Sequence, residues 1–270
     1  MTPITLTLAL VTLLQADIGR TVLATVLNPR NQAIVDLEAD DFVVREAGQP
    51  REILSARIAD YPIVVLIDTG DASAGQFDAI RSAASRFITR VGQRPIALGT
   101  LASAPAIVAS FDEDRVTLLR RLNAVAADRA GDARVIEGIA NGARVIRTLD
   151  VPFSAIVVVS ASAAVTVGDA SNESLRQILD SHAIVHVVVH RSASGVPSND
   201  ELRALTEQTR GQLTTIYSAA SFQIALDHLA DQMAAEMMID YIVPGNAPPK
   251  EDVTVGVRVP GARVKGLGVR

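Results

Sequence analysis

Cysteine and tryptophan are both absent from this chain of 270 residues, and aromatic residues make up only 3% of it. Without cysteine there can be no disulfide, no thiolate metal site and no cysteine nucleophile. With so few aromatics, the core has to be built from Val, Ile, Leu and Ala, a composition that suits parallel strands buried on both faces. These absences favour an α/β fold before any motif is considered.

Basic charge is also scarce. The 25 Lys and Arg residues are outnumbered by 30 Asp and Glu, which gives a formal net charge of -5 and a pI near 5.4. No cluster of Lys and Arg alternates with aromatic residues, so the sequence has no electrostatic footprint for DNA or RNA. The Gly-rich phosphate loops, Gly-x-Gly-x-x-Gly and the P-loop, are missing as well. We therefore expect neither a nucleic-acid partner nor a nucleotide, and we assign no cofactor.

An apolar run over residues 4–14 is the longest near the N-terminus, and it is followed by Ala16 and the polar Asp17. This run has the length of a signal-peptide core with a small residue at the cleavage point, and it is too short to span a bilayer. No cation precedes it, and a buried first strand is the alternative interpretation. We expect residues 1–16 to be a signal peptide and the protein to be exported, either periplasmic or secreted.

The pattern of apolar and polar residues in the remaining sequence changes twice. Short β-like runs and turns fill residues 17–60. From residue 61 to residue 240, apolar strand runs alternate with amphipathic helices, which is typical of a mostly parallel sheet covered on both faces. Residues 241–270 again have the pattern of short β-strands. This predicts a three-layer, doubly wound α/β domain over 61–240, flanked by a small β module that the C-terminal strands complete.

Within the α/β region, Ile63–Ile67 is a run of five consecutive aliphatic residues, which predicts a central strand. Two runs joined by a turn at Ser103-Ala104-Pro105 predict a hairpin at one edge of the sheet. Gly211 stands where the C-cap of a helix is expected. The last helix is expected from residue 220 to residue 239. The other expected elements are helices over 77–91, 112–122, 135–146 and 171–182, a helix capped by Ser198 and Glu201, and strands over 96–101, 106–110, 155–159, 183–189 and 213–217.

Five short motifs follow one another in a fixed order. They are Leu37–Gly48 (LEADDFVVREAG), Ile63–Ala72 (IVVLIDTGDA), Phe111–Asp114 (FDED), Thr209–Gly211 (TRG) and Tyr241–Pro244 (YIVP). In this order and spacing they resemble the von Willebrand factor A domain, and most closely the exported bacterial proteins described as VWFA-related, in which a short β module precedes the A domain. The resemblance implies a domain used for binding.

The resemblance also implies a metal-ion-dependent adhesion site at the carboxyl ends of the strands, where a doubly wound sheet leaves its ligand crevice. The family holds Mg²⁺ with Asp-x-Ser-x-Ser in a first loop, a Thr in a second and an Asp in a third. In the first loop of this chain Asp68 is kept, but Gly70 and Ala72 stand at the two Ser positions and bring no side-chain oxygen.

The second and third loops have lost their ligands too. Ala133 or, one residue earlier, Asp132 stands where the family has Thr, and Ala161 stands where it has Asp. Mg²⁺ needs hard oxygen ligands in near-octahedral geometry, so one carboxylate with scattered helpers should bind it poorly. We expect no metal. Residues that could substitute as oxygen ligands are Asp71, Asp132, Ser73 and Ser160.

These observations predict a non-catalytic domain that binds or scaffolds a protein partner without metal and has no catalytic residues. The alternative is a hydrolase, because Asp68-Thr69-Gly70 after an apolar run resembles the aspartic protease signature. That chemistry needs two carboxylates that share a proton. A second such motif is absent, so the chain would have to dimerise, and an amphipathic helix follows the motif directly.

Two sets of repeated side chains have simpler interpretations than metal or sulfur sites. His182, His186 and His190 recur every fourth residue, as on a metal-binding helix face, but the segment is predicted to be a strand. At roughly 3.3 Å per residue, His186 and His190 would be about 13 Å apart, too far for one ion. The methionines expected on the last helix are interpreted as core residues, namely Met233, Met237 and Met238.

Overall fold

The computed structural model describes residues 17–128, 131–161, 172–190, 200–245 and 252–269. The chain forms two compact units. We call residues 58–236 the α/β unit, and the segments on either side of it, up to residue 57 and from residue 237, the β unit. The α/β unit is therefore an insertion in the β unit. The expected signal peptide lies outside the described residues.

A six-stranded sheet in the order β10-β9-β8-β5-β6-β7 forms the centre of the α/β unit. Neighbouring strands are parallel except for β7, which pairs antiparallel with β6. The expected edge hairpin and the expected central strand are both confirmed. The strands are β5 (Ile63–Asp68), β6 (Ile96–Leu101), β7 (Ala106–Ala109), β8 (Ala155–Ser160), β9 (Ile184–His190) and β10 (Leu213–Ile216).

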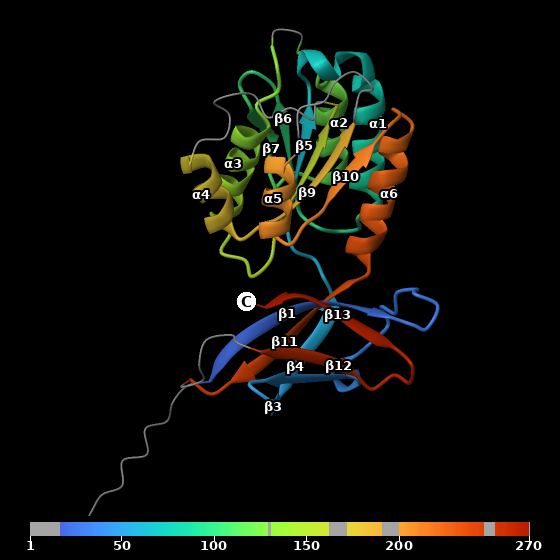
Figure 1. The fold of residues 1–270 in the computed structure, drawn as a ribbon, viewed down its shortest axis with the longest axis vertical. Coiled ribbons are helices and arrows are strands. Elements are labelled where there is room, and N and C mark those ends of the chain that lie inside the picture. Colours follow the sequence, from blue (N-terminus) through green and yellow to red (C-terminus); the bar gives the residue numbers. More distant parts are fainter. Residues whose placement is uncertain (1–16, 129–130, 162–171, 191–199, 246–251, 270) are drawn as a thin grey trace, which may run out of the picture. The chain divides into compact units, whose positions relative to one another are not determined.

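Helices cover both faces of this sheet. In Figure 1, α3, α4 and α5 lie on one side of it and α1, α2 and α6 on the other. All six residues of β5 are buried, as its unbroken aliphatic run predicts for a strand between two helix layers. The three-layer, doubly wound α/β fold is confirmed. The helices are α1 (Phe77–Arg90), α2 (Arg115–Ala124), α3 (Val135–Ile146), α4 (Asn172–Ser181), α5 (Asp200–Gln208) and α6 (Ser221–Ala234).

Local sequence explains the bounds of the helices around β5. In α1 the buried residues Ile80, Ala84 and Phe87 are spaced by three and four, so one face docks on the sheet. Asp114 caps α2, because its carboxylate accepts a hydrogen bond from the Thr117 N–H at 2.9 Å. These signals are local, which is why the sequence predicts both helices.

The last helix is shorter than expected. It ends at Ala234, and strand β11 (Glu236–Val243) begins two residues later, so the prediction of a helix up to residue 239 is wrong. Every second residue, Met237, Ile239 and Tyr241, packs into the core of the β unit. This two-residue period is that of a strand and not of a helix. Met233 packs in the helix as expected, whereas Met237 and Met238 belong to the strand. The expected change of unit at residue 240 falls inside β11.

Gly211 has a different role from the one predicted. Arg210, not Gly211, has the left-handed backbone after α5, with φ 62°. A Cβ at Gly211 would lie 1.8 Å from the backbone oxygen of Val185 in β9. The C-cap interpretation is therefore wrong, and glycine is required because two backbone segments approach closely.

The β unit consists of two sheets in the orders β13-β1-β11-β4 and β12-β2-β3. Strands from the two chain ends pair antiparallel, β1 with β13 and β2 with β12. The turn between β2 and β3 has Ala47 and Gly48 in the left-handed region, and β3 begins at Gln49. The strands are β1 (Ile18–Leu27), β2 (Phe42–Glu46), β3 (Gln49–Arg51), β4 (Ile53–Ile58), β12 (Val253–Val257) and β13 (Arg263–Val269), and a short 3-10 turn, Ala39–Asp41, precedes β2.

In the part of the chain that the structure describes, none of the helices combines the length and the apolar character needed to cross a membrane.

Candidate functional site

The predicted site residues lie at the carboxyl ends of β5 and β8. These two strands are neighbours, and the chain continues from β5 toward β6 on one side and later from β8 toward β9 on the other. Such a reversal of strand order is the point where doubly wound sheets bind ligands, and we call the loops around Asp68 at this point the crevice. Asp68 is the last residue of β5, and Ser160 is the last residue of β8.

Asp68 is fully buried, and both of its carboxylate oxygens accept hydrogen bonds from the chain. Oδ1 accepts the Gly70 N–H at 2.8 Å, and Oδ2 accepts the Ser160 hydroxyl at 2.5 Å. Hydrogen bonds to a carboxylate offset the free energy that its burial would otherwise cost. The chain itself thus holds Asp68 in one orientation.

Backbone contacts bring the three predicted loops together around Asp68. The Asp71 N–H donates to the Gly131 carbonyl at 3.0 Å, and the Asp128 N–H donates to the Thr69 carbonyl at 2.6 Å. The third loop joins through the Ala161 N–H, which donates to the Ser73 hydroxyl at 3.1 Å. Short-range sequence patterns contain no sign of these contacts, because each one joins residues of different elements.

Gly70 sits where the first and second loops pack most closely. A Cβ built there would lie 2.8 Å from the Ala133 nitrogen, 3.1 Å from the Gly131 oxygen and 3.2 Å from Asp68 Oδ1. Its φ of -65° is accessible to any residue, so the requirement for glycine is steric and not conformational. A serine at this position would need the second loop to move.

The seven predicted site residues divide into a buried group and an exposed group, and we call the exposed residues Asp71, Ala72 and Asp132 the rim. Asp68, Gly70 and Ala133 are buried, whereas Asp71, Ala72 and Asp132 are exposed and Ala161 is half-buried. Gly70, Ala72, Ala133 and Ala161 bring no side-chain oxygen to the crevice. Over the described ranges, no three His, Asp or Glu side chains form a group that could hold a metal ion.

Several polar residues near the crevice were not predicted. Thr69 is buried, and its hydroxyl donates to the Leu101 carbonyl at 3.1 Å. The side-chain amide of Gln76 lies 3.2 Å from Nδ1 of His190, whose ring centroid is 6.4 Å from that of Phe222. The position of His190 at the end of a predicted strand was the only signal for this contact.

The remaining histidines are not part of the crevice. His186 lies within β9, as predicted, and desolvation lowers its pKa to about 4. His182 precedes this strand with a left-handed backbone, φ 57°. The strand interpretation of this segment is confirmed, so the three histidines do not share a helix face.

Comparison with known proteins identifies the fold. Neither a protein-family model nor a curated protein matches the sequence. Among solved structures, a von Willebrand factor type A protein from Catenulispora acidiphila matches with a TM-score of 0.57 and 9% identity, over 93% of this chain and 73% of that one. At this identity the likeness shows the fold, and the predicted von Willebrand factor A fold is confirmed.

Two longer proteins also share the fold. Proximal thread matrix protein 1 from the mussel byssus matches with a TM-score of 0.52 and 8% identity, over 80% of this chain and 51% of that one. The pilus adhesin SpaC from Lactobacillus rhamnosus GG matches with a TM-score of 0.51 and 9% identity, over 85% of this chain and 47% of that one. This chain spans about half the length of these two proteins.

Proposed function

We propose that this chain is a non-catalytic, protein-binding domain of the von Willebrand factor A type, which contacts its partner through the loops at the carboxyl end of the sheet and needs no metal. The observation that supports this most directly is the hydrogen bonding of the Asp68 carboxylate. Both of its carboxylate oxygens are already hydrogen-bonded, to the Gly70 N–H and the Ser160 hydroxyl. The chain supplies the contacts that hold this carboxylate in place.

The residues present do not fit an Mg²⁺ site. Mg²⁺ demands near-octahedral oxygen coordination and gives up its waters reluctantly. Three positions that would supply oxygens in the family are Gly or Ala here, a fourth is Ala133 or Asp132, and the steric fit around Gly70 leaves no space for a serine side chain. The Ser73 hydroxyl is engaged by the Ala161 N–H. We therefore infer that partner binding does not pass through a shared cation.

The rim is where a partner would make contact. Asp71 and Ala72, in the 3-10 helix Asp71–Gln76, and Asp132, on the second loop, are exposed, and the backbones of these segments are hydrogen-bonded to each other and to the sheet. Loops held by a rigid scaffold are the usual place for recognition residues. One protein of this fold is named a pilus adhesin, which supports an adhesive or scaffolding role. Export through residues 1–16 would bring the domain to such a partner.

We do not propose hydrolysis. An aspartic protease needs a second carboxylate beside the first, whereas the Asp68 carboxylate accepts hydrogen bonds from a backbone N–H and a hydroxyl. No feature of the described residues favours the protease alternative.

Site-specific photo-cross-linking in the source cells tests the proposal. A photo-reactive amino acid replaces Ala72 on the rim, and in a matched control it replaces Ala234, which is also an exposed alanine but lies at the end of α6. We expect one discrete cross-linked protein at position 72 and none at position 234. Asp71→Asn and Asp132→Asn should weaken the cross-link, and chelation of divalent metals should leave it unchanged.

Two results would contradict the proposal. A partner that cross-links at position 234 and not at position 72 would place binding away from the crevice. A cross-link at position 72 that disappears on chelation would show that a metal takes part.

A further inference from the structure

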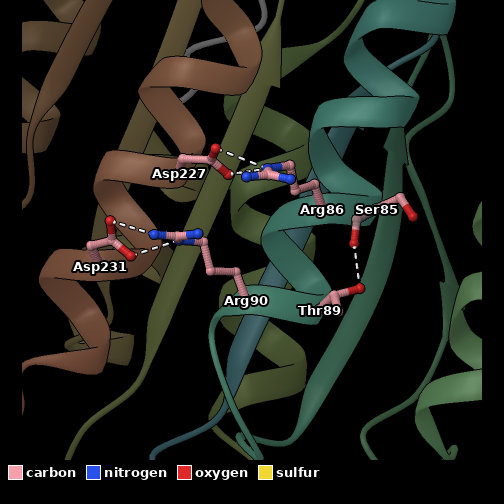
Figure 2. Close-up of polar contacts among 6 residues, drawn as sticks. All are labelled: Ser85, Arg86, Thr89, Arg90, Asp227 and Asp231. Carbon is pink, nitrogen blue, oxygen red and sulfur yellow. Dashed lines mark hydrogen bonds and ion pairs between the residues drawn. The ribbon is translucent and has the colours of Figure 1, made fainter.

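Arginines recur every fourth residue at positions 86, 90 and 94, along α1 and the loop that follows it. The first two form a ladder of ion pairs with α6, which Figure 2 shows. Nε of Arg86 donates to both carboxylate oxygens of Asp227, at 2.8 and 2.9 Å. Arg90 donates to the two oxygens of Asp231, at 2.6 and 2.8 Å. We call these two pairs the ladder.

The third arginine is buried and lies at the end of the ladder. Arg94 is 3% exposed, donates to the Met233 carbonyl at 2.6 Å, and lies 3.5 Å from the Glu236 carboxylate. Its guanidinium carbon is 4.1 Å from the ring centroid of Tyr61, whose hydroxyl donates to Glu236 at 2.5 Å. We call Tyr61, Arg94 and Glu236 the clamp.

The clamp lies where the chain enters and leaves the α/β unit. This unit begins at Ile58 and ends at Glu236, and the Ala59 N–H donates to the Glu236 carbonyl at 2.8 Å. Tyr61 follows the entry directly, and Glu236 is the exit. The clamp therefore holds the two ends of the inserted unit together with buried, charge-assisted contacts.

Tension applied to the two ends of the chain would act first on the β unit, because both outer segments of the chain belong to it. Its first and last strands, β1 and β13, are antiparallel neighbours, and Val22 in the middle of β1 pairs with Val269 at the end of β13. The two chain ends therefore leave from the same end of this pair of strands. Pulling them apart opens the backbone pairs one after another from that end, which needs little force at each step.

We propose that the clamp and the ladder make the α/β unit a mechanically protected insertion, so that tension on the chain ends unfolds the β unit first and leaves the α/β unit folded. As long as β4 and β11 remain paired in the sheet of the β unit, no force pulls the first and last residues of the α/β unit apart. Once the β unit has yielded, tension acts on Ala59 and Glu236, and the clamp has to break before β5 can leave the sheet. The crevice around Asp68 would thus stay intact under load.

Single-molecule force spectroscopy on the full chain, attached at both ends, tests this order. We expect a first extension on the order of 25 nm from the described β unit, at about 3.4 Å per residue. A second extension, on the order of 60 nm from residues 58–236, should follow at higher force. A single event of the combined length, or the longer extension appearing first, would overturn the proposal.

Three variants separate the clamp from general stability. Because Arg94→Met leaves Glu236 buried without its cation, the second event should occur about tenfold faster or more at constant force. Tyr61→Phe removes one hydroxyl and should accelerate it less. Arg81→Met is the matched control, since Arg81 is an arginine of α1, the helix that precedes Arg94, and pairs with Asp78 of α1 at 2.6 Å.

The first event serves as an internal reference and should be unchanged in every variant. An unchanged second event in both Arg94→Met and Tyr61→Phe would overturn the role of the clamp. So would an equal acceleration in Arg81→Met. Should Arg94→Met fail to fold, the comparison of Tyr61→Phe with Arg81→Met decides the same question.

Discussion

A buried carboxylate lies at each end of the central sheet, and the two are stabilised by different kinds of partner. At the carboxyl end, Asp68 is held by neutral groups, the Gly70 N–H and the Ser160 hydroxyl. At the amino end, where Tyr61 precedes β5 and Arg94 precedes β6, Glu236 is held by a phenol and a guanidinium. One end therefore uses dipoles and small side chains, and the other uses an opposite charge.

This difference determines how each end responds to mutation. Removal of a cation leaves a buried charge without its partner, which is among the most destabilising of single changes. Removal of a dipolar partner leaves one unsatisfied oxygen, which costs less. We therefore expect the exposed residues at the carboxyl end to tolerate more changes than the buried residues at the amino end, which suits the proposed function.

The largest effect is expected from Arg94→Met, because both members of the Arg94–Glu236 pair are buried. We expect the free energy of unfolding to fall by about 3–5 kcal/mol. Chemical denaturation followed by circular dichroism measures it, with Arg94→Met, Glu236→Gln and the double variant forming a thermodynamic cycle. If the two single changes were additive, the ion pair would not be the reason for the loss.

A smaller loss is expected from Gly70→Ser at the carboxyl end. The new Cβ would lie 2.8 Å from the Ala133 nitrogen, so the second loop has to shift. Overpacking of this kind costs about 1–3 kcal/mol. Ala72→Ser, on the exposed rim, is the matched control and should change stability by less than about 0.5 kcal/mol. Equal thermal stability of the two serine variants would show that the loops around Gly70 are not closely packed.

Asp68→Asn should lower the free energy of unfolding by about 1 kcal/mol, which is less than Arg94→Met and at the low end of the range for Gly70→Ser. The asparagine oxygen can accept the Gly70 N–H, and its amide can donate to Ser160 after the hydroxyl turns. Denaturant unfolding of the wild type and the variant measures the difference. A loss of several kcal/mol would indicate that the negative charge itself is needed, as it would be beside a bound cation.

The smallest effect is expected from Arg90→Met in the ladder. The side chains of this ion pair are 42% and 54% exposed, and exposed ion pairs contribute little to stability. Its contribution should shrink further as salt is added, because mobile ions screen surface charges. A salt-independent loss as large as that of Arg94→Met would remove the distinction between the ladder and the clamp.

Local patterns in the sequence were sufficient for most of the α/β unit. The aliphatic run of β5, the spacing of Ile80 and Phe87 in α1, and the cap at Asp114 each report on their own element. The end of α6 was misjudged because the methionines of Met237-Met238 fit a helix as well as a strand, and only the core of the β unit distinguishes the two.

The site and the clamp depend on contacts that sequence spacing does not reveal. Asp68 was found from its motif, but its bond to Ser160 spans 92 positions. The four-residue spacing of Arg86 and Arg90 is visible in the sequence, yet Asp227 and Asp231 lie 141 positions further along the chain. Only the packing of α6 beside α1 makes them partners.

Metal titration tests the central claim, that the crevice around Asp68 works without a cation, most directly. Thermal unfolding and calorimetry of the full chain would be compared in a chelator and in millimolar Mg²⁺ or Mn²⁺. An ion that binds only the folded state raises its stability by mass action, so a site of useful affinity must shift the Tm. We predict no shift and no heat of binding. A rise in Tm that disappears in Asp68→Asn would contradict this account.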